Sequence, residues 1–166
     1  MASITVIAHN IRSSYNIGSI FRTCEGFGVS KLILSGYTPY PAITHDTRLP
    51  HISKKTTDQI HKTALGAESM VDFEYVENIY EWLSTNKLPL VGLEQSIRSV
   101  AINSFQPPKE FILLLGEEVR GIDASLLKEC NDIVEIPMHG KKESFNVSVA
   151  CGVALYAFLS AHSEDR

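Results

Sequence analysis

The sequence predicts an α/β fold in which helices flank a mostly parallel sheet. Strand-like apolar runs alternate with helix-like segments along the chain, which is the order expected for a parallel sheet. One run, residues 111–116, is continuously apolar, as in a strand that is covered on both faces. The final segment, residues 147–161, is rich in Ala, Val and Leu and predicts a strong helix.

The elements can be placed in chain order from the apolar period. Predicted strands cover residues 4–8, 31–36, 70–76 (near an edge), 88–93, 111–116 and 133–138. Predicted helices cover residues 16–26, 79–83, 124–130 and 147–161. The stretch 37–61 has no clean period and is too long for an ordinary connection. We therefore expect a functional excursion there, with a short helix around residues 57–63.

Composition indicates a soluble globular protein rather than a dedicated nucleic-acid binder. The 166 residues are 44% hydrophobic and 20% charged, which favours one domain with a sizeable core. The net charge of −4 lacks the positive excess of most nucleic-acid binders. The charges are uneven, however, because residues 45–62 are basic and residues 68–81 hold five acids and no Lys or Arg. This pattern suits an enzyme that touches a polyanion at one place, and chance clustering on a solvated surface explains it equally well.

Several signals together predict a cytoplasmic protein without a metal. No apolar run approaches the roughly 20 residues of a membrane span, and the N-terminus lacks the pattern of a signal peptide. The cysteines Cys24, Cys130 and Cys151 are odd in number and scattered, which favours free buried thiols in a reducing compartment. The six histidines show no zinc-binding spacing.

Three segments at predicted strand ends carry candidate functional residues, because ligands of open parallel sheets bind beyond the carboxyl ends of strands. The first, residues 16–23, contains Asn16 and Gly18, which permits the close approach of another backbone, and Arg22, which could hold a phosphate. A capping Asn and a surface Arg are the simpler interpretation of this segment alone. The second, residues 116–122, is a charged turn between two glycines, and alone it reads as an ordinary turn.

The third segment, residues 136–146, runs from a strand into the last helix. Ser144 and Asn146 are natural helix caps when taken singly. Leu93, Ile136 and Met138 could form an apolar lip over an adenine. Other enzyme classes fail on spacing, since the chain lacks a G-x-G-x-x-G after its first strand, a P-loop and a nucleophile elbow.

Together, in this order and at these separations, the three segments resemble the motifs of the SpoU (TrmH-like) branch of the SPOUT RNA 2'-O-ribose methyltransferases. The resemblance covers nearly the whole chain, through residues 16–28, 115–121 and 136–150. Cys24, Glu117 and Phe145 stand where the family commonly has Ala, Asn and Leu. Phe145, which replaces the usual Leu, bears on the shape of the cofactor pocket.

The resemblance implies a fold, a reaction and partners. The fold is an α/β sheet whose C-terminal part forms a deep trefoil knot. The reaction transfers a methyl group from S-adenosylmethionine to a ribose 2'-hydroxyl of structured RNA and leaves S-adenosylhomocysteine. Family members are homodimers that share their active sites. We expect residues 1–166 to form a single methyltransferase domain with no additional RNA-binding domain, which by analogy favours tRNA over rRNA.

The resemblance also assigns roles to residues. The catalytic set is Arg22, Asn16, Glu118, Ser144 and Asn146. The cofactor-binding set is Leu93, Gly116, Ile136, Met138 and Ser144. The RNA-binding set is Arg22, Arg48, Lys54 and Lys55. Because an arginine stays protonated, Arg22 is expected to orient and stabilise, with the bound phosphate or a water as the proton acceptor.

Two alternatives remain open. One is a non-catalytic RNA-binding module on the same fold, against which the presence of every polar residue in the catalytic set speaks. The other is a different small-molecule α/β enzyme, whose activity would need no RNA.

Overall fold

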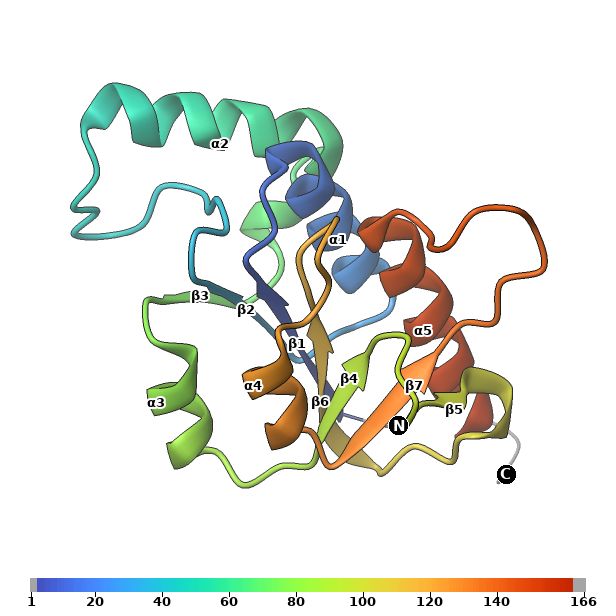
Figure 1. The fold of residues 1–166 in the computed structure, drawn as a ribbon. Helices are drawn as coiled ribbons and strands as arrows, with labels where there is room; N and C mark the ends of the chain where they lie inside the picture. The colour runs from blue at the N-terminus through green and yellow to red at the C-terminus, as the bar shows by residue number, and fades with distance from the viewer. Residues whose placement is uncertain (1–2, 163–166) are drawn as a thin grey trace.

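A seven-stranded, all-parallel sheet forms the centre of the molecule (Figure 1). The computed structural model describes residues 3–162, so the ends of the expected domain 1–166 lie outside the described residues. The strand order is β3-β2-β1-β6-β4-β7-β5. The strands are β1 (Ser3–His9), β2 (Lys31–Ser35), β3 (Phe73–Val76), β4 (Leu90–Leu93), β5 (Val100–Ala101), β6 (Glu110–Leu115) and β7 (Asp132–Glu135).

Helices cover both faces of this sheet. One hydrophobic cluster joins the sheet to α1 (Ser14–Gly26), α2 (Pro50–Ala64) and α5 (Val147–Ala161). A second joins the opposite face to α3 (Ile79–Thr85) and α4 (Ala124–Glu129). Figure 1 shows α3 and α4 together on one side of the strands and α1 between α2 and α5 on the other. The predicted fold class, a mostly parallel sheet flanked by helices, is therefore confirmed.

Alternating side chains in the central strands supply the two cores. In β1, Val6 belongs to the first cluster and Ile7 to the second. In β6, Leu113 faces the first cluster while Ile112 and Leu114 face the second. All of these residues are at most 1% exposed. Successive strand residues point to opposite faces, so a strand covered on both sides must be apolar throughout.

Most elements fall within two residues of where the sequence places them, with three larger differences at strands. The edge strand β3 begins at Phe73 rather than at residue 70, because a 3₁₀ turn, Ala67–Ser69, precedes it. The last predicted strand ends at Glu135, so residues 136–138 belong to a loop instead. The two-residue strand β5 was not predicted, since a segment of that length has no readable period.

The helix α2 is longer than predicted. It spans fifteen residues, starting at Pro50, which suits the first turn of a helix. Its buried residues are only Ser53, Ile60 and Ala64, so its apolar stripe is too thin for the period to reveal. The helix ends where Leu65 adopts a left-handed conformation with φ 52°.

Cys24, Cys130 and Cys151 are all free and buried, as predicted. Within residues 3–162, no helix combines the length and apolarity needed to cross a membrane.

Candidate functional site

A cavity opens beyond the carboxyl ends of β4, β6 and β7, which are neighbours in the sheet. We call it the strand-end cavity. All five residues of the predicted cofactor-binding set lie on its wall: Leu93, Gly116, Ile136, Met138 and Ser144. The cavity thus brings together residues from three parts of the chain, 93–95, 115–121 and 135–150, as expected where ligands bind parallel sheets.

The wall of this cavity is part apolar and part acidic. Its apolar part adds Leu115, Val147 and Ala150 to the predicted residues. Its charged part consists of Glu94, Glu117, Glu118 and Glu135, with Arg120 as a cation among them. Such a wall can cover a flat apolar group and also meet positive charge, which is the mixture typical of small-molecule sites.

Two glycines give the second predicted segment, the loop 116–122, its tight shape. A Cβ on Gly116 would lie 2.4 Å from the carbonyl carbon of Gly121, so only glycine lets the loop close on itself. Glu117 and Gly121 exchange backbone hydrogen bonds of 3.0 and 2.9 Å across this closure. Gly121 has a φ of +69°, a conformation that favours glycine. The predicted tight bend at Gly121 is confirmed.

Glu118 ties the loop 116–122 to residues 12–16, the turn into α1, which we call the first loop. Its Oε2 accepts the backbone N–H of Arg12 at 3.0 Å, and its Oε1 accepts that of Ser13 at 3.1 Å. The side-chain amide of Asn16 donates to Oε1 at 3.1 Å. These bonds join residues more than 100 positions apart and hold the start of α1 against the end of β6.

Asn16 and Asn146 extend the connection to the third loop. The amide nitrogen Nδ2 of Asn146 donates to Oδ1 of Asn16 at 3.1 Å. The Oδ1 of Asn146 also accepts the backbone N–H of Ser148 at 2.9 Å, so Asn146 caps α5 as well. Asn16 is not a cap, because Ser13 caps α1. We refer to Glu118, Asn16 and Asn146 as the loop bridge.

The hydrogen bonds of the loop bridge set the charge state of Glu118. Partial burial raises the pKa of this carboxyl, but the N–H groups of Arg12 and Ser13 and the Asn16 amide lower it more. The net effect is a pKa below the ordinary glutamate value. Glu118 is therefore a fixed carboxylate near neutral pH and is poorly suited to donate a proton.

An ion pair that the sequence analysis missed supports the same loop. The guanidinium Nη2 of Arg12 lies 2.9 Å from Oε1 of Glu117, whose side chain is only 7% exposed. The other oxygen of Glu117 accepts the backbone N–H of Arg120 at 2.6 Å. Glu117 therefore has a structural partner on the first loop, although it stands where Asn is common.

The comparison with protein families decides the identity. The model of the SpoU rRNA methylase family matches residues 3–156. The chain belongs to the SpoU rRNA methylase family.

Curated relatives of this SpoU chain include enzymes that act on different RNAs. A 23S rRNA (guanosine-2'-O-)-methyltransferase of Coxiella burnetii is 26% identical over 162 residues, which cover 93% of this chain and 57% of that protein. A tRNA (guanosine(18)-2'-O)-methyltransferase of Saccharomyces cerevisiae is 28% identical over 167 residues, which cover 97% of this chain and 11% of that protein. The chain therefore spans less than two thirds of either relative.

Solved structures share the fold of this SpoU chain. The Aquifex aeolicus TrmH/SpoU tRNA modifying enzyme superposes with a TM-score of 0.79 at 24% identity, covering 99% of this chain and 78% of that one. The AdoMet-bound rRNA methyltransferase of Sinorhizobium meliloti superposes with a TM-score of 0.76 at 23% identity, covering 98% and 56%. At such identities the likeness establishes a common α/β fold.

Within the SpoU chain, Arg22 lies apart from the strand-end cavity. It is exposed on α1 and lines a separate groove beside Lys62 on α2. Ser144 lies on the wall of the cavity, as does Glu118 of the loop bridge. Of the predicted catalytic residues, Glu118, Asn16 and Asn146 are thus joined by hydrogen bonds, Glu118 and Ser144 line the cavity, and Arg22 lies outside it.

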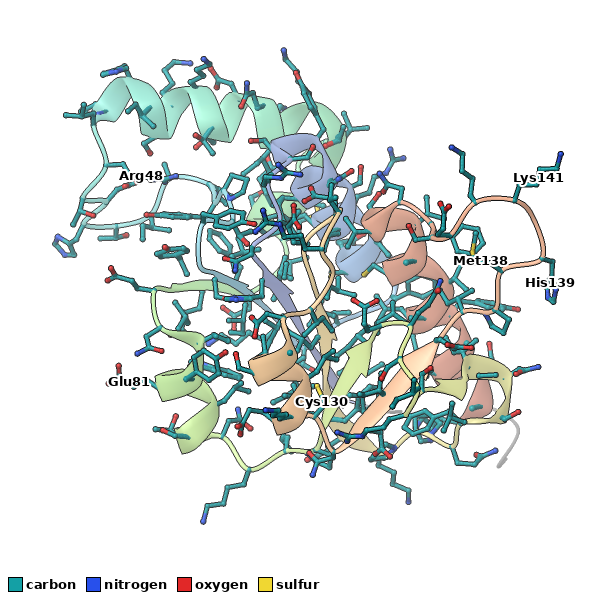
Figure 2. All side chains as sticks on the ribbon, in the orientation of Figure 1. Arg48, Glu81, Cys130, Met138, His139 and Lys141 are labelled. Atoms are coloured by element: carbon teal, nitrogen blue, oxygen red, sulfur yellow. The ribbon has the colours of Figure 1, made fainter. Side chains whose placement is uncertain are left out.

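The guanidinium of Arg48, a predicted RNA-binding residue, is engaged within its own loop. It pairs with Asp46 at 2.5 Å, donates to the carbonyl oxygens of Tyr40 and Pro41, and lies 3.5 Å from the centre of the Tyr40 ring. Its side chain is 17% exposed. Figure 2 places Arg48 in the loop that precedes α2. Arg48 therefore organises this loop rather than offering a free cation to RNA.

The predicted RNA-binding lysines lie on the outer surface of α2. Lys54 pairs with Asp58 one helical turn away, at 2.6 Å. Lys55 is exposed and has no hydrogen bond or ion pair within residues 3–162. The structure thus leaves Lys55 freer than Lys54 for an anionic ligand.

Two of the missed wall residues had a usable signal. Glu94 directly follows β4 and Glu135 ends β7, so both are charged residues at strand ends of the kind used to choose the three loops. Glu94 accepts the backbone N–H of Ile122 at 2.9 Å, and Glu135 accepts the hydroxyl of Ser99 at 2.6 Å. By contrast, Arg12 had no such signal, because its role depends on a partner 105 residues away.

Proposed function

We propose that this protein transfers a methyl group from S-adenosylmethionine to a ribose 2'-hydroxyl of structured RNA in the cytoplasm. The observation that carries the proposal is the strand-end cavity, lined from residues 116–121 and 136–145, together with the loop bridge that ties Glu118 on its wall to Asn16 and Asn146. Family membership and the 2'-O-methyltransferases among the relatives support the same reaction.

S-adenosylmethionine matches the chemistry of the strand-end cavity. Leu93, Ile136 and Met138 would cover the adenine, and the carboxylates of the wall would meet the positive charges of the sulfonium and the amino group. When bound, this cofactor supplies an electrophilic methyl group and becomes S-adenosylhomocysteine. In the described residues, the Ser144 hydroxyl has no hydrogen-bond partner, which leaves it available to a ligand.

The chain's own residues would act mainly by positioning. The loop bridge fixes the relative placement of the loops that surround the cavity, and correct placement of reacting groups supplies much of a rate enhancement. Arg22 would hold an RNA phosphate next to the target ribose and stabilise negative charge there. The 2'-hydroxyl proton would pass to that phosphate or to a water, because an arginine stays protonated.

We also propose a homodimer in which Arg22 of one subunit serves the cavity of the other. Arg22 does not line the cavity of its own subunit, so a second copy would complete the site. The helix α5 exposes Val149, Val153 and Tyr156, which are 50%, 37% and 66% exposed and share one helix face. An apolar face of this kind suits symmetric association.

The resemblance further leads us to propose the C-terminal trefoil knot. The strand β7 lies between β4 and β5, while the chain runs from β4 through β5 back to β6 before it reaches β7. The strand β7 therefore inserts between β4 and β5, two strands that precede it in the chain. This order supports the knot.

Among RNAs, we favour tRNA as the substrate. The tRNA (guanosine(18)-2'-O)-methyltransferase of Saccharomyces cerevisiae, at 28% identity against 26% for the 23S rRNA enzyme of Coxiella burnetii, supports this choice.

The deciding experiment incubates the purified protein with radiolabelled S-adenosylmethionine and either total tRNA or rRNA. Mass analysis of the digested nucleosides should then find a 2'-O-methyl ribose in tRNA. Label on a base would contradict ribose methylation, and label in rRNA alone would contradict the tRNA preference. RNA binding without methyl transfer, together with no saturable heat on titration with S-adenosylmethionine, would establish the non-catalytic alternative.

A further inference from the structure

A groove between α1 and α2 gathers positive charge and hydroxyl groups outside the strand-end cavity. We call it the helix groove. It is lined by Ser19, Arg22, Thr23, Lys62, Thr63 and Leu65. Two cations and three hydroxyls thus come from α1 and from the C-terminal end of α2, which residues 27–49 separate in the sequence.

Gly18 explains why the two helices meet closely enough to form this groove. A Cβ on Gly18 would lie 2.2 Å from the carbonyl oxygen of Ile60 and 2.1 Å from Oγ1 of Thr63. Thr63 also donates its hydroxyl to the carbonyl oxygen of Tyr15 at 2.8 Å, which fastens α2 to the start of α1. Arg22 follows Gly18 by four residues, so it lies one turn further on the same side of α1.

The cations of the helix groove have no partner in the part of the chain that the structure describes. Arg22 and Lys62 are both exposed, and neither makes a hydrogen bond or an ion pair there. Their neighbours behave differently, since Arg48 pairs with Asp46 and Lys54 with Asp58. Among residues 3–162, no acidic side chain lines the groove. The groove therefore presents unneutralised charge to an anion.

We propose that the helix groove binds one backbone phosphate of the substrate RNA through Arg22 and Lys62 together. This inference rests on the proposed function and adds Lys62 to the residues that hold RNA. An arginine fork and a lysine point charge, with hydroxyl donors beside them, are the groups that most often contact nucleic-acid phosphates. The Thr23 hydroxyl has no hydrogen-bond partner among the described residues and would donate to the same phosphate.

Lys55 extends the charged surface along α2. It precedes Lys62 by seven residues, about two turns, so both lie on one side of the helix, roughly 10 Å apart along its axis. An RNA strand bound in the helix groove would therefore meet Lys55 at a neighbouring phosphate.

The test measures RNA affinity against salt concentration for Lys62→Ala and for the matched control Lys87→Ala. Lys87 is exposed next to α3, which packs on the opposite face of the sheet. Losing one phosphate contact should weaken RNA binding about 3- to 10-fold and reduce the slope of log K against log salt by about 0.7–0.9. Lys62→Arg should keep the wild-type slope, and all three variants should bind S-adenosylmethionine as the wild type does.

A double-mutant cycle tests whether Arg22 and Lys62 hold the same phosphate. If they do, the losses of RNA-binding free energy caused by Arg22→Ala and by Lys62→Ala should not add in the double variant. Additive losses, or a Lys62→Ala slope equal to that of Lys87→Ala, would overturn the proposal. Saturable heat with inorganic phosphate at matched ionic strength, with an unchanged RNA slope in Lys62→Ala, would show a site for free phosphate and also overturn it.

Failure of this inference can be told apart from failure of the proposed function. A wild-type protein that methylates RNA while Lys62→Ala matches Lys87→Ala would reject only the helix groove. A protein that transfers no methyl group, yet loses one phosphate contact in Lys62→Ala, would reject the activity and retain the groove.

Discussion

At the scale of single residues, the site depends on the Glu118 carboxylate. It accepts three N–H groups from the first loop, two of them from the backbone of Arg12 and Ser13. A carboxylate with several such donors is held in place as well as kept ionised. Glu118 is thus a positioning residue, and its contribution is the arrangement of the loops rather than proton transfer.

We predict that Glu118→Ala lowers both stability and methyl transfer. The backbone N–H groups of Arg12 and Ser13 would lose their acceptor at exposed and part-buried positions, where a hydrogen bond contributes about 0.5–1.5 kcal/mol. Urea unfolding and a methyl-transfer assay measure the two effects. Glu81→Ala is a suitable control, because Glu81 is exposed on the outer side of α3 (Figure 2). Equal behaviour of the two variants would refute the role of Glu118.

The lowered pKa of Glu118 predicts a pH dependence of stability. The folded state holds this carboxyl ionised, so its stabilisation is complete above the ordinary glutamate pKa of about 4.3. It is lost as the pH falls through the lower folded-state value. The difference in unfolding free energy between wild type and Glu118→Gln should therefore be constant near neutrality and shrink below about pH 4. A difference that grows in acid would have the wrong sign.

At the scale of elements, the contact between α1 and α2 depends on Gly18. We predict that Gly18→Ala destabilises the protein by about 1–3 kcal/mol, because the added methyl would meet a backbone oxygen of α2. It should also weaken RNA binding by moving Lys62 away from Arg22. Urea unfolding and RNA titration measure these effects.

Gly26 provides the matched control in the same helix. A Cβ there meets nothing within 4 Å, and its backbone needs no positive φ. Gly26→Ala should be neutral or stabilising by up to about 1 kcal/mol. If Gly18→Ala were equally harmless, the close contact would not determine how α2 packs.

For the whole molecule, the proposed homodimer would let a second copy supply Arg22 to the strand-end cavity of one subunit. We predict that Tyr156→Asp converts the dimer to an 18.4 kDa monomer and abolishes methyl transfer, because a charge would be buried in an apolar interface. Sedimentation measures the mass. Met70→Asp, a similar change at a residue that is 70% exposed away from α5, should remain dimeric and active. An active Tyr156→Asp monomer would exclude a shared site.

Most of the sheet could be predicted because strand periodicity is local. The apolar run 111–116 became β6, and the Ala-rich segment 147–161 became α5 with the predicted bounds. The helix α2 was underestimated, since only Ser53, Ile60 and Ala64 are buried and the sequence shows no strong stripe. Its length is determined by packing against α1, which involves residues about forty positions away.

Six of the seven strands, the polar residues at their ends and the glycines that allow tight turns could be predicted, because each depends on a few contiguous residues. Which of these residues meet became visible only in the folded chain. The strand order places β6 beside both β1 and β4, and this brings Glu118 to Asn16. The fold of the loop before α2 pairs Arg48 with Asp46, and the packing of α2 on α1 sets Lys62 beside Arg22. Such partnerships follow from strand order and helix crossing, which no local pattern encodes.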